Sequence, residues 1–339
     1  MKTETKAART RRLLRLAVLF ASLLMLAGPF EVQAAKKMAT EAHGKYAYFA
    51  VDNTIYRMNS NTGTVRKICA VEGVAMIGKI SYYNGYLYFD ANVYHGSDGS
   101  EYRIYRIRKN GKNLQELGYG IHPRIYNGKL YYAAAAIENV DDDEGKAPQT
   151  MVYGLAKCKT NGTKRKILVD FPDERNWVYD LEIIGGRIYY VAENSLYSVK
   201  TSGKGQIRHF DALDMKSDGT SIYLQTEDEI IRFRISSGIT PIIKTRWSEG
   251  GEPLTCLVYV KSGYLYYKEV DEDGRTAFWR VRISTKKKKK LKSYNIVEMA
   301  AASGSYVAVY RSMGDGSHVL AKMKTNGKKY KKIASYFRS

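Results

Sequence analysis

The stretch YYNGYLYF, residues 82–89, decides the fold, because its five aromatic residues are interrupted by a single Asn-Gly pair. Asn-Gly supplies the positive φ angles of a two-residue hairpin turn, and aromatic residues favour strands. Close relatives of this stretch recur at residues 125–132, 183–190 and 260–267. The sequence therefore predicts one antiparallel β-hairpin that is used repeatedly.

The spacing of these hairpins predicts the architecture. A glycine precedes the aromatic strand in seven units whose mean interval is about 43 residues, and an all-strand repeat of about 40–50 residues is typical of β-propeller blades. Residues 120–168 read as four consecutive strands, with a variable loop at 138–150 between the second and the third. No stretch after residue 35 keeps a helical apolar period, so we expect almost no helix. The aligned glycines are Gly44, Gly85, Gly128, Gly186, Gly219, Gly263 and Gly304.

We therefore predict an all-β fold, a seven-bladed β-propeller of four-stranded antiparallel blades with about 28 strands, as a single domain over residues 35–339. Six or eight blades stay open, because the interval between Gly186 and Gly219 is short. The predicted repeats lie near 40–78, 79–119, 120–170, 178–211, 212–245, 254–293 and 294–335.

The first 34 residues read as a signal peptide. A basic segment precedes an apolar run at residues 16–28, and small residues at Val32 and Ala34 suit cleavage after Ala34. The apolar run has 13 residues, which is short for a membrane span. An uncleaved anchor is the alternative. We predict a secreted or cell-wall-associated protein with no transmembrane span in the mature chain.

The repeat resembles that of bacterial secreted β-propeller proteins of unknown function and, more distantly, the YWTD repeats of low-density-lipoprotein receptors. The resemblance covers nearly all of residues 40–335 and departs from YWTD after Tyr132 and Tyr267, where Trp-Thr-Asp is absent. It implies the fold and no catalytic residue, because the shared motif consists of turn and core residues. The matching residues are 84–89, 104–107 and 110–112, with equivalents at 127–132 and 161–163.

Charge predicts two different faces. The chain carries a net charge of +21, and turns between third and fourth strands are basic while loops between second and third strands are acidic. Alternating strand direction places these two classes of connection on opposite faces. The run TKKKKKLKS, residues 285–293, belongs to the basic class, and we predict contact with an anionic cell-wall polymer there; a solvated lysine hairpin is the alternative. The polyanion-binding candidates are Lys286, Lys287, Lys288, Lys289 and Lys290.

No local motif predicts catalysis. The five histidines lie in separate repeats, and neither a metal-ligand spacing nor a nucleophile motif is present. We therefore expect a non-enzymatic binding or scaffold protein for a protein or glycan ligand, with no catalytic residue, metal, cofactor or nucleic-acid partner. A glycan-active hydrolase or lyase at the propeller mouth is the alternative. The ligand-binding candidates, placed on the acidic face with its variable loops, are Tyr119, His122, Trp177, Asp180, Trp247 and Glu298.

Overall fold

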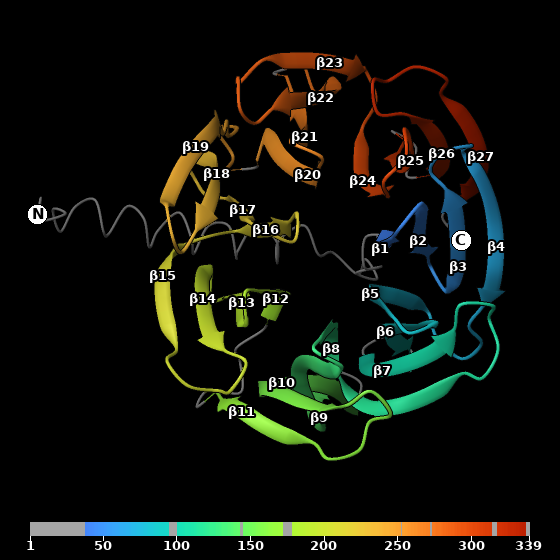
Figure 1. Ribbon diagram of the computed structural model, residues 1–339, viewed down its shortest axis with the longest axis vertical. Coiled ribbons are helices and arrows are strands. Elements are labelled where there is room, and N and C mark those ends of the chain that lie inside the picture. Colours follow the sequence, from blue (N-terminus) through green and yellow to red (C-terminus); the bar gives the residue numbers. More distant parts are fainter. Residues whose placement is uncertain are drawn as a thin grey trace, which may run out of the picture.

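The computed structural model describes residues 38–94, 100–142, 145–171, 178–251, 253–271, 273–313 and 317–336. Every regular element in these ranges is a strand, and the 27 strands form six sheets (Figure 1). The all-β prediction is therefore confirmed. The predicted signal peptide and Trp177 lie outside the described residues.

Five of the six sheets have four strands in sequence order. The first contains β1 (Met38–His43), β2 (Tyr46–Val51), β3 (Thr54–Asn59) and β4 (Thr64–Ala70). A second four-stranded sheet contains β12 (Val178–Ile184), β13 (Arg187–Ala192), β14 (Ser195–Lys200) and β15 (Ile207–Asp211), and a third contains β16 (Asp214–Ser217), β17 (Ile222–Gln225), β18 (Glu229–Arg234) and β19 (Gly238–Lys244). A fourth contains β20 (Thr255–Lys261), β21 (Tyr264–Val270), β22 (Thr276–Arg282) and β23 (Lys288–Lys292). The fifth contains β24 (Ile296–Ala301), β25 (Tyr306–Ser312), β26 (His318–Lys324) and β27 (Lys331–Tyr336).

The sixth sheet has seven strands, where the sequence predicted two separate blades. It contains β5 (Met76–Tyr83), β6 (Tyr86–Tyr94), β7 (Ser100–Arg108), β8 (Gln115–Tyr126), β9 (Lys129–Asp142), β10 (Gly145–Lys159) and β11 (Lys166–Asp170). The first half of β8 pairs with β7 and the second half with β9. The predicted boundary at residues 119 and 120 therefore falls inside one continuous strand, which lowers the sheet count from seven to six and the strand count to 27.

The predicted loop at 138–150 is also different in the structure. Strands β9 and β10 continue through most of it as a paired arm, in which Asp142 is opposite Gly145. Near the base of the arm, Gln149 bridges to Ser100 at the start of β7. Backbone pairing thus replaces the variable loop that the sequence predicted.

The sheets are arranged around a common centre, as Figure 1 shows, and the innermost strands follow one another around it. Strand β1 contacts β5, and the contacts continue through β8, β12, β16, β20 and β24, which contacts β1 again. The hydrophobic core lies between neighbouring sheets: Phe49 of β2, for example, is buried together with Tyr310 of β25. Stacked faces of this kind bury the apolar side of every repeat.

Hydrogen bonds join the last sheet to the first. The Ser60 hydroxyl accepts from the backbone N–H of Ala302 at 3.2 Å, and the Ser60 carbonyl accepts from that of Tyr306 at 2.8 Å. The backbone N–H of Ser303 donates to the carbonyl of Gly44 at 3.2 Å. No strand is exchanged between the two ends of the described chain, so packing and these bonds connect them.

Basic side chains of third strands reinforce the contacts between neighbouring units. Arg106 donates to the carbonyl of Thr160 at 3.0 Å, and Arg280 donates to that of Thr325 at 3.1 Å. Lys157 and Lys322 make the corresponding bonds, to the carbonyls of Thr201 at 3.2 Å and Gly63 at 2.5 Å. Each bond reaches a turn of the following unit, so part of the basic charge has a structural role.

Candidate functional site

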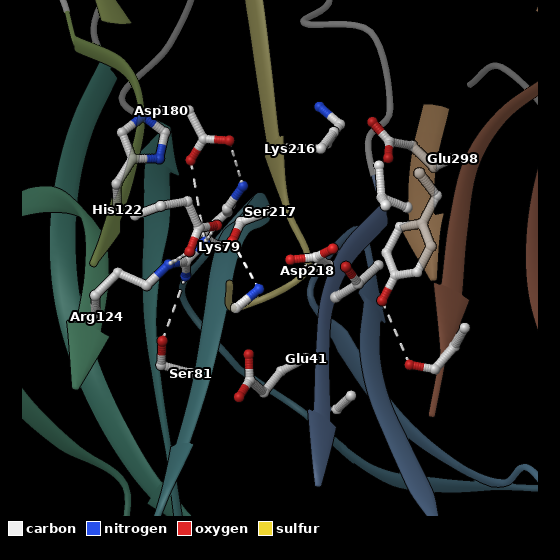
Figure 2. Close-up of a pocket in the computed structure, with 18 of the residues that line it drawn as sticks. Glu41, Lys79, Ser81, His122, Arg124, Asp180, Lys216, Ser217, Asp218 and Glu298 are labelled. Atoms are coloured by element: carbon white, nitrogen blue, oxygen red, sulfur yellow. Dashed lines mark hydrogen bonds and ion pairs between the residues drawn. The ribbon is translucent and has the colours of Figure 1, made fainter. Parts of the chain in front are cut away.

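The innermost strands enclose a cavity of about 690 Å³ at the centre of the ring. Its lining is mostly polar and charged, and Figure 2 shows side chains from several of these strands converging on it. The cationic lining residues are Lys79, Arg124, Lys216 and Lys261, and the acidic ones are Glu41, Asp90, Asp180, Glu182, Asp214, Asp218 and Glu298.

The hairpin register explains which residues point inward. Alternate residues of a strand share one face, and the position two residues before the end of an inner strand lines the cavity in five units. That position holds a different residue type in most of them. The five residues are Glu41, Ser81, Arg124, Glu182 and Tyr259.

Arg124 is the centre of an ion-pair network on the cavity wall. Its guanidinium binds Glu182 through two bonds, from Nη2 at 2.7 Å and from Nε at 3.1 Å. Its Nη2 also lies 4.0 Å from Asp180, and its Nη1 donates to the Ser81 hydroxyl at 3.3 Å. Two-point binding fixes both partners in direction as well as distance. Figure 2 shows Arg124 and Ser81 joined across the wall.

Lys79 and Asp180 form the second pair of the network. Their Nζ and Oδ2 atoms are 2.7 Å apart, and the Asp180 side chain is only 7% exposed. Burial alone would raise the pKa of this carboxyl, but neighbouring positive charge, that of Lys79 first, outweighs burial and holds the pKa well below its usual range. Asp180 is therefore ionised at neutral pH. Lys216 is paired similarly with Asp214 at 2.9 Å.

His122 stands beside this network as a neutral imidazole. Its Nε2–H donates to the carbonyl of Val178 at 2.9 Å, whereas its buried Nδ1 has no hydrogen-bond partner among the described residues. Burial lowers the pKa of His122 to about 4. The residue has a φ of 56° and lies in the bulge of β8 between Ile121 and Arg124. Gly120 and Ile121 already pair with β9, so the bulge lies inside the β8–β9 pairing.

Asp90 is a buried carboxyl that holds two irregular inner strands together. It is 2% exposed and accepts a hydrogen bond from the backbone N–H of Lys79 at 2.8 Å. Burial raises its pKa to about 6, although backbone donors, including that of His122, act in the opposite direction. A Cβ at Gly78 would lie 2.1 Å from Oδ2 of Asp90, so a larger residue at that position must displace the buried carboxyl.

Two cavity groups have pKa values close to neutrality. Burial raises the pKa of Glu41 to about 7, against the effect of Arg124 and with that of Glu182. Burial lowers the pKa of Lys261 to about 8, and its Nζ donates to the carbonyl of Gly304 at 2.7 Å. Among the described residues neither group has a carboxylate or cation within ion-pair distance. Both can therefore change protonation when a ligand enters.

The structure brings three of the six ligand-binding candidates to this cavity: His122, Asp180 and Glu298 line it, as Figure 2 shows. Tyr119 lies elsewhere, with its ring 5.2 Å from the guanidinium of Arg103. Trp247 also lies outside the lining and donates its indole N–H to the carbonyl of Glu227 at 2.5 Å. The five polyanion candidates at 286–290 are all exposed and far from the cavity lining.

Sequence reasoning missed Glu41, Lys79, Arg124 and Lys261. For Glu41, Lys79 and Arg124, the signal that could have found them was their distance from the turn that ends each inner strand; Lys261 is itself the last residue of its strand. Counting back two residues from the hairpin register finds Glu41 and Arg124. The same step of two finds Lys79 from Ser81.

Comparisons with known proteins support the fold. No family model matches the chain, and a search of curated proteins finds no relative. A puromycin hydrolase S511A mutant matches at 11% identity and a TM-score of 0.60, over 88% of this chain and 53% of that chain. A structure from a study of two prolyl endopeptidases matches at 10% identity and a TM-score of 0.59, over 99% and 56%. The chain thus spans just over half the length of these proteins.

These likenesses show the fold alone: it is a β-propeller. The nidogen–laminin complex also matches, at 14% identity over 65% of this chain and 83% of that chain, but its TM-score of 0.44 is too low to carry an argument. The resemblance to a secreted repeat family therefore stays a prediction.

Two features are absent from the described residues. In those ranges, no group of three or more His, Cys, Asp or Glu side chains is placed to hold a metal ion. The same part of the chain contains no helix with the length and apolar character needed to cross a membrane.

Proposed function

We propose that this protein is an exported, non-enzymatic binding propeller whose protein or glycan ligand enters the central cavity. The observation that carries the proposal is the preorganised wall, in which Arg124 and Lys79 hold Glu182 and Asp180 in fixed orientations. Fixed charged groups in a concave site can orient a polar ligand without reorganising.

An exposed aromatic side chain at the cavity supports the same proposal. Tyr179 lines the cavity and is 52% exposed, although it is a large apolar side chain. At the other end of the inner strands, Tyr82 also lines the cavity and stacks on His43 with the ring centres 4.0 Å apart. Aromatic rings beside hydrogen-bonding groups suit ligands that have both an apolar face and polar edges, such as a sugar ring or a peptide.

We also propose that the seven-stranded sheet functions as two blades that share β8, which gives a seven-bladed ring. The partner of β8 changes from β7 to β9 between Tyr119 and Gly120, so each half pairs with a different neighbour. Each of the seven strands that follow one another around the cavity would then be the first strand of one blade.

The cavity proposal is tested by retention of a ligand on immobilised protein. The chain from residue 35 onward and its Tyr179→Ala variant are incubated with cell-wall fractions and secreted proteins. Tyr83→Ala is the matched control, since Tyr83 is 38% exposed but does not line the cavity. We expect a species that is retained by the wild type and by Tyr83→Ala but is lost with Tyr179→Ala. Equal retention by all three proteins contradicts the cavity as the binding site.

One observation favours the enzymatic alternative, a glycan-active hydrolase or lyase. Glu41, with a pKa of about 7, and Asp180, which is ionised, line the same cavity. Glycoside cleavage uses two carboxyl groups held in different protonation states. The test is release of new reducing ends from wall glycans, which Glu41→Gln would abolish and Glu193→Gln, an exposed control, would not. No release by the wild type excludes this alternative for the glycans assayed.

Export and wall attachment complete the proposal. The basic and apolar segments within 1–34 support export, and the five exposed lysines at 286–290 support contact with an anionic wall polymer. We expect the N-terminus of the secreted protein at Ala35 or Lys36 by mass spectrometry. An intact N-terminus at Met1 in a membrane fraction would contradict signal cleavage.

A further inference from the structure

The basic charge of this protein is unevenly distributed among the repeats. In three repeats, the segment formed by the third strand, the fourth strand and the turn between them contains basic residues but no acidic residue. These segments carry eight basic residues at 276–292, six at 318–336 and three at 54–70. The corresponding segments of the other repeats all contain at least one acidic residue, for example Glu116 and Asp170. These three segments therefore contain no carboxylate of their own to neutralise their cations.

These segments are neighbours on the perimeter. Figure 1 shows β23, β27 and β4 as successive outermost strands, because the last unit adjoins the first. Most of their cationic side chains are exposed and have no carboxylate within ion-pair distance among the described residues. The exposed cations on these strands and on the turns before them are Lys286, Lys287, Lys288, Lys289, Lys290, Lys328, Lys329, Lys331, Lys332, Arg66 and Lys67.

Other cations in the same segments have structural partners. Arg280 and Lys322 donate to carbonyls of the following unit. Arg57 lies 4.8 Å from the centre of the Tyr46 ring. These side chains point to fixed partners. In the exposed set on the outer strands, Lys288 has its Nζ 5.8 Å from the centre of the Tyr267 ring, and the other side chains have no such partner among the described residues. The two groups can therefore be separated by mutation.

We propose that β23, β27 and β4 form one continuous binding track for a linear polyanion, with closely spaced phosphate or carboxylate groups lying along the perimeter. This inference rests on the proposed wall-polymer contact and locates it on the outer rim of three units rather than on a whole basic face. A flexible chain can follow a convex rim and neutralise several lysines at once. A flat anionic surface touches such a rim only locally.

The test uses long-chain sodium polyphosphate as the probe and the chain from residue 35 onward. Affinity is measured as a function of salt for the wild type and for Lys288→Gln/Lys289→Gln/Lys290→Gln. The control is Lys159→Gln/Lys164→Gln/Lys166→Gln, which removes the same charge from exposed positions of the third repeat. Lys288→Arg/Lys289→Arg/Lys290→Arg keeps the charge on the track and checks that the edge strand still folds.

We expect the first variant to lose at least tenfold in affinity, with the slope of log affinity against log salt reduced by about 2, as loss of three ionic contacts implies. The control and the arginine variant should bind within about twofold of the wild type. Equal losses in both glutamine variants would overturn the track but leave a wall-polymer contact through the general field of the basic face.

Absence of polyphosphate binding by the wild type at low salt would overturn both the track and the wall-polymer contact. The lysines would then serve only to keep an exposed edge strand from pairing with other chains. Binding to vesicles that contain phosphatidylglycerol, without binding to polyphosphate, would overturn the linear polyanion in favour of a membrane surface.

Discussion

Replacing Glu41 by glutamine should stabilise the protein above neutral pH and leave it unchanged in acid. Burial raises the pKa of Glu41 from its ordinary value of 4.5 to about 7. The unfolded chain therefore releases the Glu41 proton at a lower pH than the folded protein does. Stability associated with this group is fully present below pH 4.5 and is lost as the pH rises through about 7.

The magnitude follows from the two pKa values. At about 1.36 kcal/mol per pH unit, a difference between 4.5 and about 7 corresponds to about 3 kcal/mol of free energy of unfolding at pH 8. This value is an upper bound, because the Glu41 side chain is only partly buried. Glutamine keeps the size of the side chain and carries no charge, so it should recover most of that free energy.

The assay is urea unfolding followed by tryptophan fluorescence, between acid and mildly alkaline pH, for the wild type, Glu41→Gln and the exposed control Glu193→Gln. Other buried groups also titrate: the pKa of Asp90 is raised to about 6 and that of His122 is lowered to about 4, and these two act in opposite directions. The difference between variant and wild type cancels their contributions. A difference that is independent of pH, or a variant no more stable than the wild type at pH 8, would refute the reasoning.

Three further substitutions test the fold around the cavity. Arg124→Leu should lower the free energy of unfolding in urea by about 3–5 kcal/mol, because it leaves Glu182 partly buried and unpaired. The double variant Arg124→Leu/Glu182→Leu should recover at least half of that loss, and no recovery would mean that the broken ion pair is not the cause. Gly78→Ala should lower the melting temperature by an amount equivalent to about 1–3 kcal/mol, because the new Cβ would lie 2.1 Å from a buried carboxyl oxygen. Gly250→Ala is the control and should be neutral, because its new Cβ would meet only the Ser248 hydroxyl, at an ordinary contact distance of 3.9 Å. Ser60→Ala should lower the free energy of unfolding by about 1–3 kcal/mol, because it removes the hydroxyl that accepts a hydrogen bond from the last sheet. An unchanged melting temperature in calorimetry would show that this bond does not contribute to stability.

The hairpins could be predicted from the sequence because their signals are local. Asn84 has a φ of 45° and Gly85 of 81°, as the Asn-Gly turn requires, and Tyr83 is opposite Tyr86 in the register. Aromatic and β-branched residues around such turns leave little alternative to strands. The all-β class and the repeat period follow from these local signals alone.

The cavity wall could not be predicted in the same way, because bulges change which residues face inward. The inner strands have register shifts between Ile77 and Ile80, between Ile121 and Arg124, and between Val178 and Asp180. Each shift changes the phase of the alternation along the strand. The two predicted blades form one sheet because β8 continues without a break from its pairing with β7, which ends at Tyr119, into its pairing with β9, which begins at Gly120. The bulge at His122 donates a backbone hydrogen bond to the buried Asp90 of another strand, a long-range contact that the sequence pattern around residue 122 does not contain.

In a repeat protein, a residue that recurs at the same position in several units is explained by the shared structure. A position at which the units carry different residues is a candidate for function. Arg106, Lys157 and Arg280 occupy related places in their third strands and all donate to the following unit, so their recurrence is explained by the architecture. Glu41 and Arg124 also occupy equivalent places, in the first strand of a unit, yet their charges are opposite and both face the cavity. The architecture requires neither charge at that place, since Ser81 and Tyr259 fit there equally well. The lysine run at 286–290 is likewise confined to one unit. Selection for stability alone would leave such positions free to vary toward uncharged residues, so the cavity and the lysine track are where a ligand should be sought.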